Sequence, residues 1–332
     1  MSNSKNKTIE TPPIAFMIFN RPEYTKAVFT EIRKARPKKL FIIADGPRTP
    51  SEEAACLETR AIVEHIDWLC EVHRNYAEKN LGLKERFRSG LNWFFENVEA
   101  GIILEDDCLP HPSFFRFAGE MLERYKDNKQ TMMISGDNFL PNFEIKDSYT
   151  FSKFFSIWGW ATWRRAWVKY DVDMKSWDSP SYKRKIKEIY NKKYMRTHMT
   201  KMFDDVYANR LKTWDVQWLY TCLMHDGLCI IPYVNLVSNI GISGTHQGGY
   251  NQNLPIFDIY RGNFTHPQVI THNIEYDNIF YERDFKPKFQ SIRAHLYGKM
   301  VATLVQYEAI KKIYRSLVKV KIFISSKRGS WN

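Results

Sequence analysis

Three consecutive acids, Glu105, Asp106 and Asp107, are the residues of this sequence best suited to hold a cation. They follow a short apolar run, residues 102–104, which is typical of a buried parallel strand. In an open α/β sheet, ligands bind outside the carboxyl ends of the strands, so the acids should face a ligand. Adjacent carboxylates repel one another and are hard oxygen ligands, which predicts Mg²⁺ or Mn²⁺ with phosphate oxygens completing the shell. The simpler alternative is a solvated acidic turn.

Two earlier apolar runs, residues 14–20 and 39–44, are also followed by polar residues, Arg21 and Asp45. Alternation of such runs with helical segments indicates a parallel sheet with right-handed crossovers. Arg21, Asp45 and Asp107 should then lie at one edge of that sheet. The alternatives are a surface salt bridge for Arg21 and a turn residue for Asp45. The expected helices cover about residues 22–35, 51–66 and 83–97, and a further strand covers 70–76.

The order of these motifs, Asn20-Arg21-Pro22, then Asp45, then the acidic triplet, resembles that of the GT-A glycosyltransferases. Over about residues 12–250 the likeness is greatest to the N-acetylglucosaminyltransferase I branch and its bacterial relatives. The resemblance implies an inverting transferase that uses a nucleotide sugar, UDP-linked, with Mn²⁺ or Mg²⁺. It also implies a GT-A-like (Rossmann-like) α/β fold, with a mixed, mostly parallel sheet flanked by helices. It assigns the metal to Asp107 and nucleotide binding to Arg21, Asp45, Lys84, Glu105 and Asp106.

Inverting transfer needs a base that deprotonates the acceptor hydroxyl. The resemblance places an acid near the start of a helix in the second half, and Asp215 in Thr213-Trp214-Asp215 fits that position. An acid there also caps a helix, which is the structural alternative. Asp204 and Asp205 are rivals, but they lie in a basic, polar helical segment and have the pattern of a solvated face. Asp137 is a further candidate for sugar or acceptor contacts.

A glycine-rich loop over residues 241–249 contains His246, which could close over the diphosphate and bind the metal or a phosphate oxygen. Most single loop histidines have no such role. In the aromatic segment 151–167, the turn Trp158-Gly159-Trp160 is the best acceptor-side candidate, because aromatic faces stack on sugars and Gly159 permits close approach. The alternative is that these tryptophans fill the core.

Composition places the chain among globular intracellular proteins. It has 332 residues, of which 15% are aromatic, and its five cysteines form no CxxC pair, which favours a reducing compartment. The N-terminus lacks an apolar signal core, and no apolar run approaches the ~20 residues of a membrane helix. We expect a flexible N-terminus (1–11), a catalytic domain (12–265) divided near residue 140 into nucleotide-sugar and acceptor halves, and a basic helical extension (266–332).

The basic charge of +12 is concentrated in two segments. Residues 286–332 hold eleven Lys or Arg against Glu308 alone, and residues 181–201 hold eight against Glu188. Within residues 310–324, apolar and basic side chains fall on opposite sides of a helical wheel, which suits the surface of an anionic bilayer. The extension would then hold a cytoplasmic enzyme beside a lipid-linked acceptor, as in lipopolysaccharide or surface-glycan assembly. Packing on the protein body or on a second subunit is the alternative.

Two other classes of function compete with a glycosyltransferase. A sugar-nucleotide pyrophosphorylase also combines an α/β sheet with an acidic metal site, but it would favour a glycine-rich basic loop where this chain has Asn20-Arg21-Pro22. A non-catalytic module that binds nucleic acid or membrane is suggested by charge alone. Because the basic segments avoid the acidic motifs, we expect no nucleic-acid partner. The absence of GxGxxG and GxxxxGK[ST] loops argues against dinucleotide-dependent and P-loop enzymes.

Overall fold

The computed structural model of the chain describes residues 10–241 and 262–284. The chain divides into two compact units, Met1–Phe280 and Tyr281–Asn332, and only residues 281–284 of the second are described. The loop around His246 and the basic tail over residues 286–332 therefore lie outside the described residues. Within the described ranges, no helix combines the length and apolar character needed to cross a membrane.

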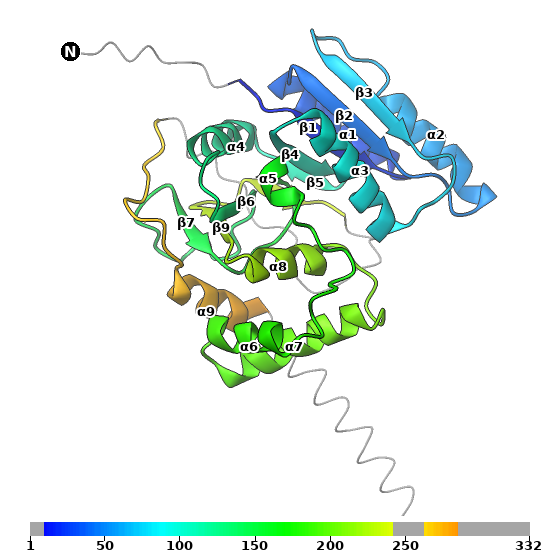
Figure 1. Ribbon diagram of the computed structural model, residues 1–332. Helices are drawn as coiled ribbons and strands as arrows, with labels where there is room; N and C mark the ends of the chain where they lie inside the picture. The colour runs from blue at the N-terminus through cyan, green and yellow to red at the C-terminus, as the bar shows by residue number, and fades with distance from the viewer. Residues whose placement is uncertain (1–9, 242–261, 285–332) are drawn as a thin grey trace, which may run out of the picture. The chain divides into compact units, whose positions relative to one another are not determined.

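Among the described residues, eight strands of the first unit form one sheet in the order β3-β2-β1-β4-β8-β6-β9-β7 (Figure 1). The four N-terminal strands, β1 to β4, are parallel neighbours, β8 runs antiparallel between β4 and β6, and β7 runs antiparallel to β9. The predicted mixed, mostly parallel sheet flanked by helices is confirmed. The strands are β1 (Ile14–Ile18), β2 (Lys39–Ala44), β3 (Glu71–Tyr76), β4 (Ala100–Glu105), β6 (Thr131–Ser135), β7 (Tyr149–Ser152), β8 (Trp160–Trp163) and β9 (Leu228–Pro232).

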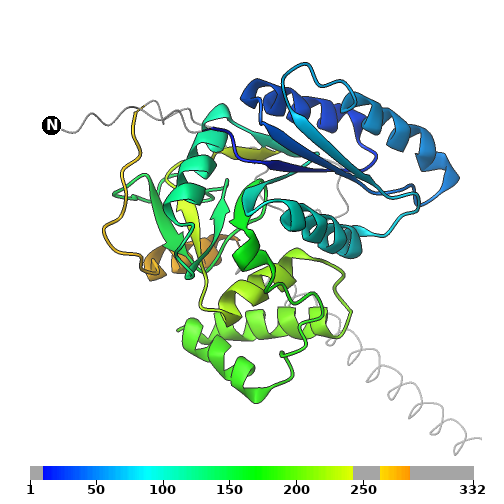
Figure 2. The ribbon, with the colours of Figure 1, turned by 45° about the horizontal axis from the view of Figure 1, so that its top comes forward.

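Helices cover both faces of the parallel strands (Figure 2). On one face, α1 (Pro22–Ala35) buries Val28, Phe29 and Ile32 in a core cluster shared with α4 (Pro112–Arg124). On the other face, α3 (Leu83–Asn97) brings Gly90 so close to Ile43 of β2 that an added Cβ would lie 2.6 Å from its side chain. Pro22 starts α1 because its fixed φ and missing N–H suit the first helical position. The short helices η1 (Pro50–Glu52) and α2 (Glu53–Ile62) follow β2.

The second half of the chain adds further helices and strands to the sheet. The basic helical segment that contains Asp204 and Asp205 forms two helices, α6 (Pro180–Ile189) and α7 (Lys193–Tyr207), which are followed by α8 (Asp215–Met224). The aromatic segment contains strands β7 and β8 and the short helix α5 (Arg164–Trp167). A separate two-stranded ribbon joins β5 (Cys108–Pro110) to β10 (Val237–Asn239). Helix α9 (Ile274–Asp284) ends the described chain.

Candidate active site at the carboxyl edge of the sheet

Strand register brings the candidate residues to one edge. Met17 of β1 pairs with Glu105 of β4, and Ile18 pairs with Ala44 of β2. Arg21, Asp45 and the acidic triplet therefore follow neighbouring parallel strands at the same end. The end of β6 reaches this edge as well, because β8 pairs with both β4 and β6. This is the end of an open α/β sheet at which ligands bind.

Arg21 neutralises part of the acidic triplet. Its guanidinium donates one hydrogen bond to Asp106 Oδ1 and another, of 2.8 Å, to Asp107 Oδ2. The Arg21 carbonyl accepts a hydrogen bond from Thr25 N (3.0 Å) at the start of α1. This bond holds the Arg21 backbone in place, and the side chain extends from there to the acids. Burial lowers the pKa of Arg21, but the charges of Asp106 and Asp107 outweigh it and raise the pKa above its usual value. The guanidinium is thus firmly charged.

The carboxyl groups at this edge outnumber that single cation. Burial raises the pKa of Asp106 to about 6, with Arg21 opposing the rise and Asp107 adding to it. Burial also raises the pKa of Glu105 well above its usual value, and the charges of Asp107, Asp106 and Asp215 add to the rise. Asp106 is 2% exposed, and its Oδ2 atom has no hydrogen-bond partner among the described residues. The electrostatics therefore favour binding of a further positive charge.

The β5–β10 ribbon returns the chain to Asp107. The carbonyl of Asp107 accepts a hydrogen bond of 2.8 Å from Ile240 N. Gly241 follows so closely that an added Cβ would lie 2.4 Å from Asp107 Oδ2. Only a residue without a side chain fits there unless the carboxylate moves, so Gly241 keeps space beside Asp107 clear. The approach of residues 240–241 to the triplet was missed by the sequence prediction, since it depends on a three-residue strand.

Asp45 is held by the turn that opens α3. Its Oδ1 accepts hydrogen bonds from Gly46 N and Leu81 N (both 2.9 Å). Its Oδ2 accepts from Asn80 Nδ2 (3.0 Å) and Gly82 N (3.1 Å). Four donors occupy this 6% exposed carboxylate, so Asp45 shapes the turn, and the structure shows no free oxygen on it for a nucleotide. Asn80, which the sequence prediction did not single out, belongs to the same arrangement.

Lys84 lies in the first turn of α3 and points its charge at Asp173, with Nζ 3.7 Å from Oδ1. The Lys84 side chain is 34% exposed and its partner Asp173 is a surface acid, so the ion pair leaves Lys84 accessible. Nothing in the described contacts joins Lys84 to the acidic triplet. Its predicted part in nucleotide binding therefore stays a prediction.

Asp137 is a buried acid at the end of β6. Trp158 N donates a 3.1 Å hydrogen bond to its Oδ2, whereas its Oδ1 has no partner among the described residues. Burial raises the pKa of Asp137 well above its usual value. With only 2% exposure, the carboxyl holds the turn before β8 in place and does not itself reach the surface. Sequence position alone did not distinguish this positioning role from direct contact with a sugar.

Asp215 begins α8 near the triplet. Thr213 Oγ1 donates a hydrogen bond to its Oδ1, which fixes the carboxylate at the helix start. Because its charge contributes to the raised pKa of Glu105, the two acids lie within electrostatic range. Trp214 stacks on Phe87 of α3 with ring centroids 4.1 Å apart, and this packing anchors the start of α8. The structure thus brings Asp215 toward the acidic edge from the opposite half of the sheet.

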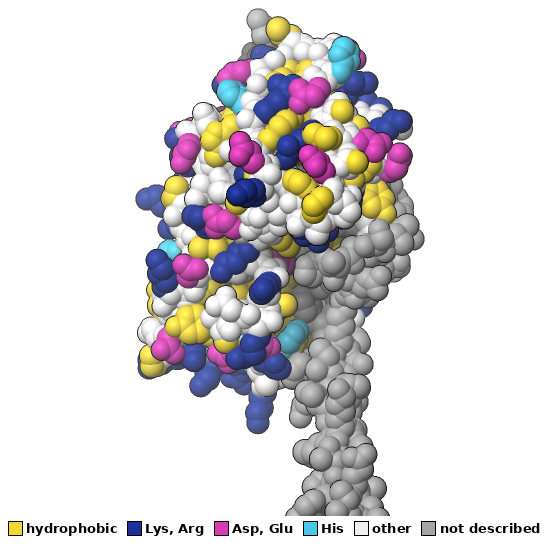
Figure 3. Space-filling view, turned by 90° about the vertical axis from the view of Figure 1, so that its right-hand side faces the viewer, with side chains coloured by type: hydrophobic (Ala, Val, Ile, Leu, Met, Phe, Trp, Pro, Cys, Tyr) yellow, Lys and Arg dark blue, Asp and Glu magenta, His cyan; other side chains and the backbone are white. Residues whose placement is uncertain are grey.

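The rival acids occupy another environment. Asp205 binds Lys201 and Arg210 at 2.5 and 2.8 Å, and Asp204 accepts a hydrogen bond from Trp177 Nε1 (2.9 Å). Both belong to α7, in the region where Lys and Arg side chains gather at the lower end of the described chain (Figure 3). The ion pairs of Asp205 agree with the expected solvated face of a basic helix, whereas Asp204 also binds the buried Trp177 side chain.

Two of the predicted acceptor residues need correction. Trp160 is completely buried, and its ring packs against those of Trp167, Trp214 and Trp218 at centroid distances of 6.3, 5.9 and 5.8 Å. No face of that ring is open to a sugar. Gly159 has φ +67°, and an added Cβ would lie 2.7 Å from the Val237 side chain. The close approach that Gly159 permits is therefore that of Val237.

Trp158 differs from these two residues. It is only partly buried, and its ring meets Phe139 edge-on at a centroid distance of 5.3 Å. Among the three residues of the turn, it alone combines partial exposure with an aromatic face. Its stacking on a sugar stays a prediction.

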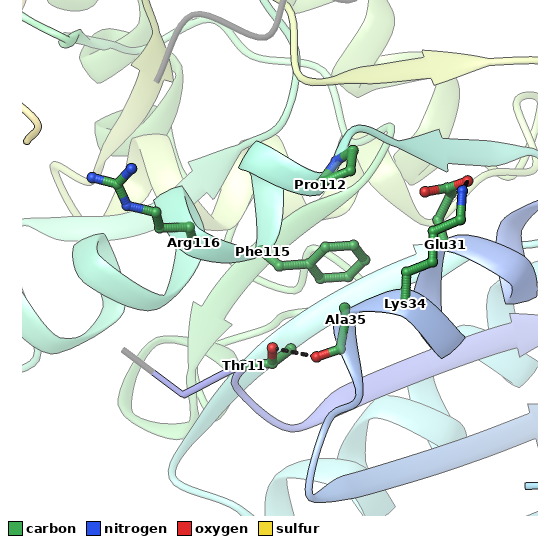
Figure 4. A pocket seen from close by; sticks show the side chains of 7 residues that line it. All are labelled: Thr11, Glu31, Lys34, Ala35, Pro112, Phe115 and Arg116. Atoms are coloured by element: carbon green, nitrogen blue, oxygen red, sulfur yellow. Dashed lines mark hydrogen bonds and ion pairs between the residues drawn. The ribbon is translucent and has the colours of Figure 1, made fainter. Parts of the chain in front are cut away.

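The described residues contain no cluster of three His, Cys, Asp or Glu side chains that could hold a metal ion by itself. The cavity drawn in Figure 4, of about 230 Å³, lies between the C-terminal end of α1 and the N-terminal end of α4. Its lining residue Lys34 is paired with Glu31 at 2.7 Å. At 1.5 Å per residue, Lys34 lies roughly 20 Å along α1 from Arg21, so this cavity is not part of the acidic edge.

No family profile and no curated protein sequence matches the chain. Among solved structures, the chain is similar to the galactosyltransferase LgtC in complex with donor and acceptor sugar analogs, at 11% identity over 64% of this chain and 70% of that chain, with a TM-score of 0.31. It is also similar to mouse xyloside xylosyltransferase 1, at 11% identity over 64% and 81% of the two chains (TM-score 0.32). A UDP-glucose pyrophosphorylase complexed with UDP-glucose shares 12% identity over 43% and 64% (TM-score 0.24). Overlaps this low do not assign a function, which has to be inferred from the site.

Proposed function

We propose that this protein is a glycosyltransferase that moves a sugar from a nucleoside-diphosphate donor to a glycan or lipid-linked acceptor. The observation that supports it is the cluster at the sheet edge, where Arg21 pairs with Asp106 and Asp107 while Asp215 approaches from α8. A guanidinium binds phosphate oxygens through two parallel hydrogen bonds, as it binds these carboxylates. The cluster therefore provides for a diphosphate and, separately, for a base.

A divalent metal, Mn²⁺ or Mg²⁺, is part of this proposal. The residues fit it, because Asp106 Oδ2 is a buried carboxylate oxygen without a partner and Asp107 lies beside it. Asp107 would hold the ion, and phosphate oxygens would complete its shell. Such an ion would neutralise the charge of the departing diphosphate. His246 could contribute a further ligand, but it lies outside the described residues.

We assign Asp215 as the general base of an inverting transfer. The acceptor oxygen would form its bond to the anomeric carbon while the bond from that carbon to the diphosphate oxygen breaks. The acceptor proton would pass to the Asp215 carboxylate, and the electron pair of the broken bond would leave with the diphosphate. Thr213 leaves Oδ2 of Asp215 available for that proton, since its hydroxyl binds Oδ1.

The finer parts of the proposal rest on the sequence. The resemblance supports UDP as the nucleotide, and the basic tail over residues 286–332 supports reversible contact with the inner face of the cytoplasmic membrane. Both suit a cytoplasmic enzyme of lipopolysaccharide or surface-polysaccharide synthesis.

The test is a panel of nucleotide sugars, scored by thermal stabilisation and by metal-dependent donor hydrolysis. We expect UDP to bind far more tightly with Mn²⁺ than without it, and Asp107→Ala to abolish the difference while the fold survives. Asp205→Ala, which removes a surface acid of α7, is the matched control and should behave like wild type. Equal UDP affinity in Asp107→Ala with and without Mn²⁺, matching the wild type, would refute the site assignment. Release of a nucleoside triphosphate when pyrophosphate is supplied would instead identify a pyrophosphorylase.

A further inference from the structure

We propose that Arg21 is an exchangeable counter-cation, which holds Asp106 and Asp107 in the free protein and passes to the diphosphate when the donor binds. Its departure frees Asp107 for the divalent cation, so that nucleotide and metal bind cooperatively. This inference rests on the proposed function and adds a regulation of the same site. It concerns the order of events at the site and the residue that enforces it.

The ion pair is arranged so that the guanidinium can leave and the carboxylates stay. The Arg21 side chain is 31% exposed, compared with 3% for Asp106 and 13% for Asp107. Asp106 and Asp107 directly follow β4, and the hydrogen bond from Ile240 N to the Asp107 carbonyl holds the backbone there. Apart from the two carboxylates, the Arg21 guanidinium contacts the Tyr24 ring, with Cζ 5.7 Å from the ring centroid, and the long side chain has several rotatable bonds.

The guanidinium and a metal ion compete for the same atom. Asp107 Oδ2 accepts the 2.8 Å hydrogen bond from Arg21, and Gly241 lies beside this oxygen so closely that an added Cβ would be 2.4 Å away. A cation that takes the place of Arg21 at Asp107 Oδ2 in the free protein must separate an ion pair. A diphosphate offers Arg21 oxygens of equivalent geometry, so the pair can be exchanged without leaving the guanidinium unpaired.

This exchange couples the two ligands. If the diphosphate removes Arg21 from Asp107, the nucleotide raises metal affinity, and the metal must raise nucleotide affinity by the same factor. A protein without the guanidinium at this position would bind the metal without waiting for the nucleotide. That difference is measurable with Mn²⁺ alone and requires no turnover.

The test titrates Mn²⁺ alone into the full-length protein and follows free Mn²⁺ by electron paramagnetic resonance. We expect Arg21→Met, which keeps much of the side-chain length without the charge, to bind Mn²⁺ about 5- to 150-fold more tightly than wild type. Adding Asp107→Asn to that variant should remove the gain. The matched control is Arg48→Met, which removes an arginine paired with Glu52 in the loop after β2 and should leave Mn²⁺ affinity unchanged.

Equal Mn²⁺ affinity in wild type and folded Arg21→Met would overturn the exchange. If Arg21→Met does not fold, the test uses Arg21→Lys, because an ammonium keeps the charge but cannot form both hydrogen bonds. Tighter Mn²⁺ binding by Arg21→Lys than by wild type supports the exchange. Unchanged Mn²⁺ binding overturns it. A second measurement compares the gain in Mn²⁺ affinity caused by UDP, which should be smaller in the variant. If UDP binds neither wild type nor the Arg21 variant, the proposed function is wrong. If UDP binds both proteins and their Mn²⁺ affinities are equal, the proposed function stands and only the exchange of Arg21 is wrong.

Discussion

The change Asp45→Asn distinguishes a turn-forming acid from a nucleotide ligand. Asp45 Oδ1 accepts from Gly46 N and Leu81 N, and Oδ2 accepts from Asn80 Nδ2 and Gly82 N, all between 2.9 and 3.1 Å. Asparagine keeps the shape but replaces one acceptor oxygen by an NH₂ donor. In either orientation of the amide, two donors of the turn then face another donor. Because Asp45 is 6% exposed, water cannot readily replace the lost acceptor.

The expected loss of stability follows from those two donors. A buried donor left without an acceptor costs about 1–3 kcal/mol, and relaxation of the turn should recover part of the total, so we expect a loss of about 2–4 kcal/mol in the free energy of unfolding. For a domain of this size, 1 kcal/mol lowers Tm by about 2–4 °C, so the melting temperature should fall by about 4–16 °C. Nucleotide affinity should change less, and only through displacement of the turn.

Urea unfolding followed by tryptophan fluorescence measures the first quantity, and UDP titration measures the second. The control is Asp67→Asn, because Asp67 is a half-exposed partner of Arg33 at 3.3 Å and its loss should cost about 0.5 kcal/mol or less. The losses of unfolding free energy in Asn80→Ala and Asp45→Asn should not add up in the double variant, since the two side chains share a hydrogen bond. Wild-type stability of Asp45→Asn together with a more than about tenfold loss of UDP affinity would refute this reasoning and make Asp45 a ligand.

Two further predictions concern catalysis and localisation. Asp215→Asn removes basicity but keeps the shape of the helix start, so turnover should fall by about 100-fold or more with donor affinity nearly unchanged, whereas Asp205→Asn should keep full turnover. Near-normal turnover of Asp215→Asn would show that another residue is the base. The full-length protein should float with anionic vesicles at low salt and be released at high salt, because each Lys or Arg near such a surface contributes ~1 kcal/mol. A chain that ends at Pro287 should stay unbound yet still bind UDP, and equal flotation of both chains would contradict a membrane role for the tail.

Apolar runs were sufficient to predict three strands of the parallel half of the sheet, whereas β3 is mostly polar. Strands β1, β2 and β4 are largely buried and are therefore nearly continuous in Ile, Leu, Phe, Met and Ala, which separates them from the amphipathic helices. The aromatic segment gave no such signal, because β7 and β8 are fully buried and the loop between them is rich in aromatic residues as well. Strand β5 has three residues, too few for any periodicity. The break between α6 and α7 likewise follows no proline or glycine.

The sequence also indicated which acids meet, but not what each one touches. Strand order alone brings Arg21 and Asp107 to one edge, and this needs no knowledge of side-chain contacts. The four hydrogen bonds of Asp45 depend on the turn after β3, and the burial of Trp160 depends on the packing of α5 and α8 against the sheet. Such contacts join segments far apart in the chain, so local pattern could not separate a ligand-binding side chain from a structural one.

Burial of the carboxylates at the acidic edge opposes the stability of the folded protein. A pKa of about 6 for Asp106, raised mainly by burial, means that the charged carboxylate is disfavoured by roughly 3 kcal/mol relative to its usual surroundings. Glu105 is shifted in the same direction for the same reason, and Arg21 compensates both only in part. At neutral pH these acids lower the stability of the folded protein, because their folded-state pKa values lie above the unfolded ones. A bound cation would lower both pKa values and recover that free energy on binding, so the same burial that weakens the free protein strengthens its attraction for a positively charged ligand.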